Sequence, residues 1–173
     1  MHRRKFLKSV TAGGTAAFMP WAASPHDHVR MRNPTVPQGY KALTAEQVAT
    51  LEAICEQIVP ADESPGAKHA GVVHFIDQVL TGPVARSYRK RYEVGLKLVD
   101  RVSQERHGQG FAALQGEQQH SVLLDLESGK AAGVAGQQFF SLLLAHTMEG
   151  YYGDPAHGGN RDGASWKMIG FKG

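Results

Sequence analysis

Cysteine is almost absent from this sequence, because Cys55 is the only one among 173 residues. A single cysteine rules out any disulfide within the chain. The chain also lacks the CxxCH motif that attaches haem covalently and the four thiolates that usually hold an iron–sulfur cluster, so it can bind neither group alone. We expect Cys55 to pack as a small apolar residue on a helix face.

An excess of basic charge is missing from the body of the chain. The formal net charge is +3, but Arg3, Arg4, Lys5 and Lys8 supply four of the 19 basic residues. No acid precedes Asp27, so the rest of the chain carries 15 basic and 16 acidic residues. A nearly neutral body has no overall excess of basic charge with which to neutralise phosphates, and this argues against binding to nucleic acid.

Motifs that carry catalysis or bind metals are also missing. The sequence contains no HExxH, no GxSxG, no GxGxxG and no phosphate-binding P-loop. Glu117 and His120 form one ExxH, which is half of the ligand set of a di-iron bundle, but there is no second ExxH. A structural or solvated role is therefore favoured for this pair. We predict no catalytic, cofactor-binding or metal-binding residue in this chain.

The first residues are typical of a signal peptide, with a basic cluster followed by an uncharged stretch over 9–23. The cluster resembles the twin-arginine pattern RRxFLK, although His2 stands where Ser or Thr is more common. The uncharged stretch is too short for a membrane span, which needs roughly 20 apolar residues. We predict a twin-arginine signal over 1–24; a basic tail or an uncleaved anchor helix is the alternative. The export-signal residues are Arg3, Arg4, Phe6, Leu7 and Lys8.

The remaining chain divides into a linker over 25–42 and a domain over 43–173. The linker is rich in proline and has no apolar period. Thr44 and Gln47 form a capping box at the start of the first helix, which Pro60 ends. Apolar spacing predicts further helices over 72–80, 83–107, 117–126 and 136–149. The fold class is therefore all-α: an irregular helical bundle of about five helices, with a Gly- and aromatic-rich, non-helical segment from Gly150 onward.

The C-terminal segment alternates aromatic residues with glycines and contains Arg161. Aromatic residues and arginine are enriched at the energetic centres of protein interfaces. The same rings could instead cover the core of the domain itself. The sequence leaves both interpretations open.

Two stretches of the chain resemble one protein family. LEAICEQIVPADESPGAKHAGVVHFID is similar to the N-terminal pattern of the gluconate 2-dehydrogenase subunit 3 family, in which a helix is followed by IxPAD and PGA. YYGDPAHGGNRDGASWKMIGFKG resembles the more specific ending of that family, aromatic-DPxxGGNRD-W-IG-G. The chain departs from the pattern at His157, Ser165 and Lys172, where an aromatic residue, Gly and Pro are common.

The resemblance implies a non-catalytic small subunit of a periplasmic, FAD-dependent gluconate 2-dehydrogenase-like complex that oxidises a sugar acid, sugar or polyol. It implies two partner subunits: a flavoprotein of the glucose-methanol-choline (GMC) oxidoreductase type, which binds FAD, and a cytochrome c subunit, which binds haem c. The small subunit would support maturation of the flavoprotein and carry it through the twin-arginine translocase. It would then be membrane-associated in the periplasm through its partner subunits.

We place the partner interface in the C-terminal segment because of its aromatic residues and Arg161. Two rival hypotheses remain: an independent exported enzyme with a site at Asp154, His157, Asn160 and Arg161, and a metal-binding helical protein. The predicted interface residues are Tyr151, Tyr152, Asp154, Pro155, Gly158, Gly159, Asn160, Arg161 and Trp166.

Overall fold

The structure is a computed structural model that describes residues 39–83 and 85–171. These residues belong to one of the two compact units of the chain, Pro34–Gly173. The predicted signal peptide over 1–24 lies outside the described residues, together with Arg3, Arg4, Phe6, Leu7 and Lys8. Most of the predicted linker over 25–42 also lies outside them.

Helices make up the whole regular structure of the described residues, which contain six α-helices, three 3-10 turns and no strand. The predicted all-α class is confirmed. Each of the five predicted helices is present, and their ends differ from the predicted ones by a few residues. The elements are α2 (Ala45–Ile58), α3 (Val72–Thr81), α4 (Ala85–His107), η1 (Phe111–Ala113), α5 (Gly116–Glu127), α6 (Gly133–Tyr152), η2 (Pro155–His157), η3 (Arg161–Gly163) and α7 (Ala164–Ile169).

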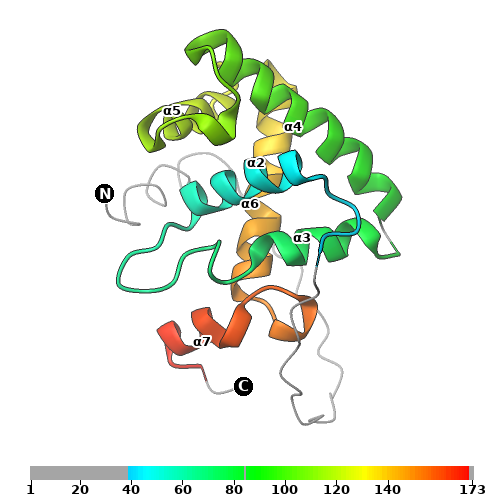
Figure 1. The fold of residues 1–173 in the computed structure, drawn as a ribbon, viewed down its shortest axis with the longest axis vertical. Helices are drawn as coiled ribbons and strands as arrows, with labels where there is room; N and C mark the ends of the chain where they lie inside the picture. The colour runs from blue at the N-terminus through cyan, green and yellow to red at the C-terminus, as the bar shows by residue number, and fades with distance from the viewer. Residues whose placement is uncertain (1–38, 84, 172–173) are drawn as a thin grey trace. The chain divides into compact units, whose positions relative to one another are not determined.

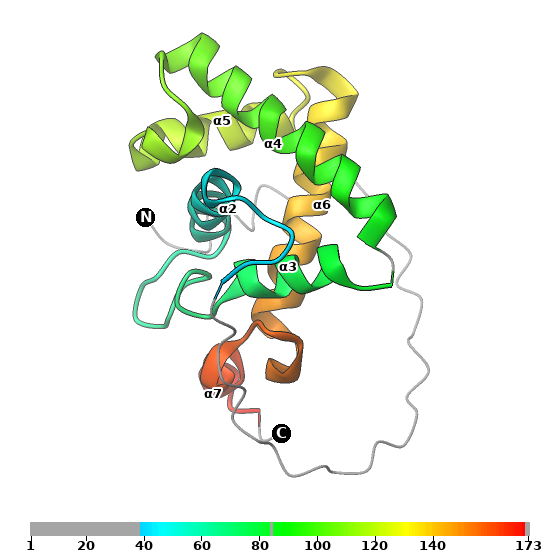
Figure 2. The ribbon, with the colours of Figure 1, turned by 45° about the vertical axis from the view of Figure 1, so that its right-hand side comes forward.

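Helix α6 is the central element, because it contacts α2, α3, α4, α5 and α7. Figures 1 and 2 show the other helices packed across it on several sides. The buried residues of α6 recur three and four positions apart and form one broad face, while residues such as Gln138, Ser141 and Glu149 on the other side are exposed. At its crossing with α4, the ring of Phe139 occupies the space that a side chain at Gly95 would need. Buried residues of α6 include Phe139, Phe140, Leu142, Leu143 and Tyr151.

Two sets of hydrogen bonds hold the start of the helical domain. The predicted capping box of α2 is confirmed, since Thr44 accepts a hydrogen bond from the Gln47 backbone and the Gln47 side chain accepts one from the Thr44 backbone. Before it, the backbone N–H groups of Lys41, Ala42 and Leu43 all donate to the carboxylate of Asp77 on α3. Asp77 thus ties the end of the predicted linker to the bundle.

The segment from Gly150 onward differs from the prediction that it is non-helical. Helix α6 continues to Tyr152, and the following residues form two 3-10 turns and the short helix α7. The spacing failed to predict α7 because it has only six residues, too few to form a helix that is stable alone. Gly163 before it and Gly170 after it both have left-handed backbone conformations, and the one at Gly170 ends the helix.

No helix of the described residues is long and apolar enough to cross a membrane.

Candidate partner interface

Asn160 holds the C-terminal segment against the end of α6. Its side chain is fully buried and donates through Nδ2 to the carbonyl of Gly153 at 2.8 Å. Its Oδ1 accepts from the backbone N–H and the hydroxyl of Ser165, at 2.9 and 2.8 Å. Its own backbone N–H donates to Gly150. Asn160 adopts a positive φ of 42°, which asparagine tolerates better than most residues.

The two glycines before Asn160 allow the segment to approach the helices closely. A side chain at Gly159 would overlap the backbone of Gly150 on α6. Gly158 has a φ of +88°, and a side chain there would overlap the amide of Gln78 on α3. The GGN sequence is therefore explained by packing, without any ligand.

The two stretches that carry the family resemblance lie against each other. The hydroxyl of Tyr151 donates to the carbonyl of Pro65 at 2.6 Å. The backbone N–H of Arg161 donates to the carbonyl of Ala70 at 2.9 Å, and its guanidinium lies beside Gly71 at the start of α3. The PADESPGA connector and the C-terminal segment thus form one joined region of the subunit.

The predicted interface residues separate into a buried and an accessible group. Tyr151, Pro155, Gly159 and Asn160 are buried and build the segment itself. Gly158, Arg161 and Trp166 are half-buried, and Tyr152 and Asp154 are exposed. Asp154 caps the turn η2 by accepting from the Ala156 backbone. Tyr151 therefore covers the core, while its neighbour Tyr152 remains available to a partner.

Further exposed apolar side chains lie on α7 and just after it, near the accessible aromatic residues in sequence. Ile169 is 59% exposed and Phe171 is 55% exposed. The ring of Trp166 meets that of Phe171 at 5.0 Å, and its indole N–H donates to the carbonyl of Tyr152. Sequence reasoning missed Met168 and Ile169 because it did not predict α7. We call this surface the C-terminal apolar patch, consisting of Tyr152, Trp166, Met168, Ile169 and Phe171.

The rival catalytic site is poorly supported by the geometry. Asn160 is buried, and its amide already bonds Gly153 and Ser165, so it cannot reach a substrate. One carboxylate oxygen of Asp154 is engaged in its turn. Within 39–171, apart from residue 84, no group of three or more His, Cys, Asp or Glu side chains is placed to hold a metal ion.

Two buried side chains in the core, the thiol of Cys55 and the imidazole of His146, are of a reactive type, but each contacts a partner within the core. Cys55 is fully buried, and its sulfur lies 3.4 Å from the hydroxyl of Thr147. Burial raises the pKa of this thiol to about 12, so it stays protonated and unreactive at neutral pH, and its expected packing role is confirmed. The hydroxyl of Tyr92 lies 2.9 Å from Nδ1 of His146, and burial lowers the pKa of that imidazole.

A family model described as gluconate 2-dehydrogenase subunit 3 matches residues 45–173, from the first residue of α2 to the end of the chain. The chain belongs to the gluconate 2-dehydrogenase subunit 3 family. Membership implies a place in a multi-subunit dehydrogenase complex. No curated protein and no solved structure matches the chain.

The residues that match the subunit 3 family include the structural features described above. The matched range contains all six helices and both stretches that pack together around Tyr151 and Arg161. The C-terminal apolar patch lies within it, on a segment held by the buried Asn160. This patch is therefore the best candidate for a contact with another subunit.

Proposed function

We propose that this subunit 3 protein is the non-catalytic small subunit of a periplasmic, FAD-dependent gluconate 2-dehydrogenase-like complex. It binds a GMC-type flavoprotein subunit through the C-terminal apolar patch. The observation that carries the proposal is the exposure of large apolar side chains, among them Ile169 and Phe171, in a chain whose family forms complexes. Clusters of solvent-exposed apolar side chains mark interaction sites.

The patch is suited to binding because its parts are already ordered. The indole of Trp166 is oriented by its bond to Tyr152 and by the ring of Phe171. A side chain that is fixed before binding loses less conformational entropy in the complex. Trp and Tyr are also the residue types that most often dominate binding energy in interfaces.

The proposal assigns different tasks to the predicted interface residues. Asn160, Gly159 and Tyr151 hold the segment in place, while Tyr152 and Trp166 present rings to the partner. In this arrangement FAD belongs to the flavoprotein and haem c to a cytochrome c subunit. Substrate oxidation takes place outside this chain.

The twin-arginine pattern supports a second task, export of the complex. This chain binds the flavoprotein in the cytoplasm, supports its maturation and carries it through the twin-arginine translocase to the periplasm. The signal residues Arg3 and Arg4 serve as the export signal for a flavoprotein that has no export signal of its own. The assembled complex is membrane-associated through the other subunits.

Replacing Trp166 and Ile169 by alanine and serine tests the interface. We expect the W166A/I169S subunit to lose at least about tenfold in affinity for the co-expressed flavoprotein, because aromatic anchors contribute about 2 kcal/mol or more. Co-purification through a tag on this subunit, followed by a titration, measures the loss. V94S/L124S is the matched control, since Val94 and Leu124 are exposed apolar residues on α4 and α5, outside the patch. Equal affinity in the two double variants would reject the patch as the interface.

A further inference from the structure

The first two turns of α4 carry four positive charges that the proposed function does not use. Arg86, Arg89, Lys90 and Arg91 are all exposed, and the first turn of the helix contains no acid. We call these residues the α4 basic cluster. Figures 1 and 2 show that this end of α4 is far from α7, so the cluster is separate from the C-terminal apolar patch.

The cluster differs from the rest of α4 in its pairing. Further along the helix, Lys97 pairs with Glu93 at 3.0 Å and Arg101 with Glu105 at 3.9 Å. Among the described residues, no acid forms an ion pair with any member of the cluster. Arg89 bonds only a carbonyl, that of Leu80, at 2.6 Å. Within the described part of the chain the cluster therefore has no ion-pair partner, although the carboxylate of Glu93, one turn further along α4, acts electrostatically on Lys90.

This arrangement is unfavourable for the isolated helix. Arg86 and Lys90 stand four positions apart on one face, and like charges at this spacing repel. All four cations also lie near the N-terminal end of the helix, where the helix dipole already provides positive potential. An anionic partner would relieve both effects.

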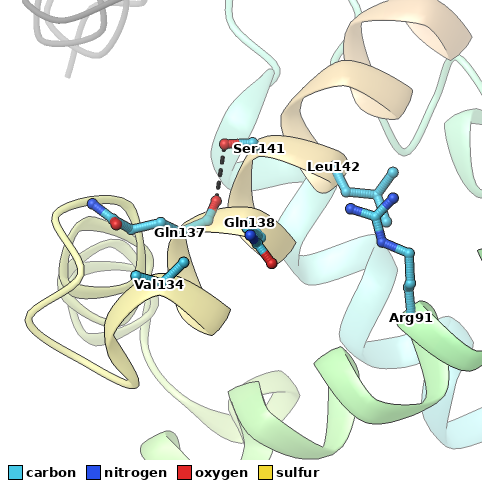
Figure 3. Close-up of a pocket in the computed structure, with 6 residues that line it drawn as sticks. All are labelled: Arg91, Val134, Gln137, Gln138, Ser141 and Leu142. Atoms are coloured by element: carbon cyan, nitrogen blue, oxygen red, sulfur yellow. Dashed lines mark hydrogen bonds between the residues drawn. The ribbon is translucent and has the colours of Figure 1, made fainter.

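A groove between α4 and α6 adjoins the cluster and adds a second set of donors. It has a volume of about 560 Å³ and is lined by Arg91, Val134, Gln137, Gln138, Ser141 and Leu142. Arg91 extends from α4 toward Leu142, and the amide of Gln138 points into the space between the helices (Figure 3). Ser141 and Gln137 already bond backbone carbonyls of α6 and α5. Arg91 and Gln138 also line the groove, and neither forms such a bond with another described residue.

We propose that the α4 basic cluster and this groove bind an acidic segment of a partner protein. Three of the four cations are arginines, whose planar guanidinium groups bind carboxylates through two parallel hydrogen bonds. The amide of Gln138 can bond a peptide backbone, and Val134 and Leu142 offer apolar contact beside it. These are the groups that an acidic chain segment requires.

A membrane surface fits the same features less well. Helices that bind membranes insert an apolar face, but the apolar face of α4, with Tyr92, Leu96 and Val99, is buried in the bundle. The cations are also not on one plane, because Arg89 reaches α3 and Arg91 lines the groove toward α6. A flat layer of lipid headgroups would meet only part of the cluster.

Binding of short labelled peptides to the purified full chain tests the proposal without the flavoprotein. The probes are a fluorescein-labelled peptide of alternating Glu and Gly and its Gln–Gly counterpart, measured by fluorescence anisotropy. We expect the wild-type chain to bind only the acidic peptide, and R86E/R91E to bind it at least about tenfold more weakly, because two carboxylate pairs are lost. K97E/R101E carries the same charge change on the same helix, and we expect a loss below about threefold.

The outcomes separate this proposal from its rivals. An equal loss in both charge-reversal variants, or no binding of the acidic peptide to the wild type, would overturn it. Binding of the wild type to phosphatidylglycerol vesicles but not to the peptide would assign the cluster to a membrane. If R86E/R91E does not fold, as judged by circular dichroism, R86Q/R91Q takes its place, with the same tenfold expectation. Failure here leaves the test of W166A/I169S unaffected, since the two surfaces are distinct.

Discussion

Tyr92 and His146 form a buried polar pair at the centre of the bundle. Their rings stack with an interplanar angle of 13°, and the tyrosine hydroxyl meets Nδ1 of the imidazole. The ring of Tyr88 packs against His146 edge-on at 4.9 Å. Burial and the nearby Arg91 lower the pKa of His146 below its ordinary value, so the fold favours the neutral imidazole.

This lowered pKa predicts a loss of stability in mild acid. The unfolded chain binds a proton at His146 near pH 6.5, whereas the folded chain does so only at lower pH. The free energy of unfolding is therefore highest above about pH 6.5 and falls as the pH drops toward the folded pKa, by at most about 1.4 kcal/mol per pH unit. The pKa of His74 is lowered as well, chiefly by burial, and adds an effect of the same sign.

His146→Asn tests this prediction, because the amide offers both a donor and an acceptor to the Tyr92 hydroxyl and does not titrate. Urea unfolding at pH 7 and pH 5 should show a smaller pH dependence than in the wild type. His157→Asn, which changes an exposed histidine, is the control and should keep the wild-type slope. An unchanged slope in His146→Asn would show that this imidazole does not lose stability by protonation.

At the scale of elements, α7 exists because of contacts outside it. It has six residues, and its first turn is tied to α6 through the bonds between Asn160 and Ser165. Trp166 makes a second tie to the end of α6. Local sequence could not predict this helix, since its stability depends on a side chain in a left-handed turn before it.

Asn160→Ala should release this element. The change leaves the half-buried carbonyl of Gly153 and the buried hydroxyl of Ser165 without their partner, so we expect a loss of about 2–4 kcal/mol in the free energy of unfolding. Trp166 should also become more exposed to fluorescence quenchers. A Trp21→Phe background leaves Trp166 as the sole tryptophan.

Two further variants sharpen this measurement. Asn160→Asp keeps the acceptor for Ser165 but places a buried carboxylate oxygen against the carbonyl of Gly153, so it should be at least as destabilising as Asn160→Ala. His157→Ala changes an exposed residue of η2 and should have little effect. A stable Asn160→Ala variant with unchanged quenching would show that other contacts hold α7.

At the scale of the whole molecule, the subunit offers two separate surfaces, one apolar at α7 and one basic at α4. The first underlies the proposed contact with the flavoprotein, and the second the proposed contact with an acidic segment. Two distinct sites suit a small subunit that holds a larger assembly together, because linked contacts strengthen each other.

The proposed export role predicts where dehydrogenase activity is found. Arg3→Lys together with Arg4→Lys should strand the flavoprotein activity in the cytoplasm, because the twin-arginine pair is replaced while the positive charge is kept. Fractionation of cells that express the complex, followed by a dye-linked activity assay, measures this. Lys5→Arg, at the variable position of the pattern, is the control and should leave activity in the periplasm. Periplasmic activity in the double lysine variant would reject the carrier role.

The sequence by itself determined the helical class, the start of α2 and the family. Apolar residues at helical spacing and the Thr44–Gln47 capping box are local signals, and local hydrogen bonding and periodicity decide helices. The export signal and the partner subunits remain predictions of the pattern.

Only the tertiary structure decided which residues of the C-terminal pattern face inward. Tyr151 and Tyr152 are neighbours, yet the first bonds Pro65 and is buried, and the second is 39% exposed. Successive residues of a helix point in directions about 100° apart, so the path of α6 across the bundle selects between them. That path depends on contacts with segments far away in the sequence. The local spacing of apolar residues carries no information about such contacts.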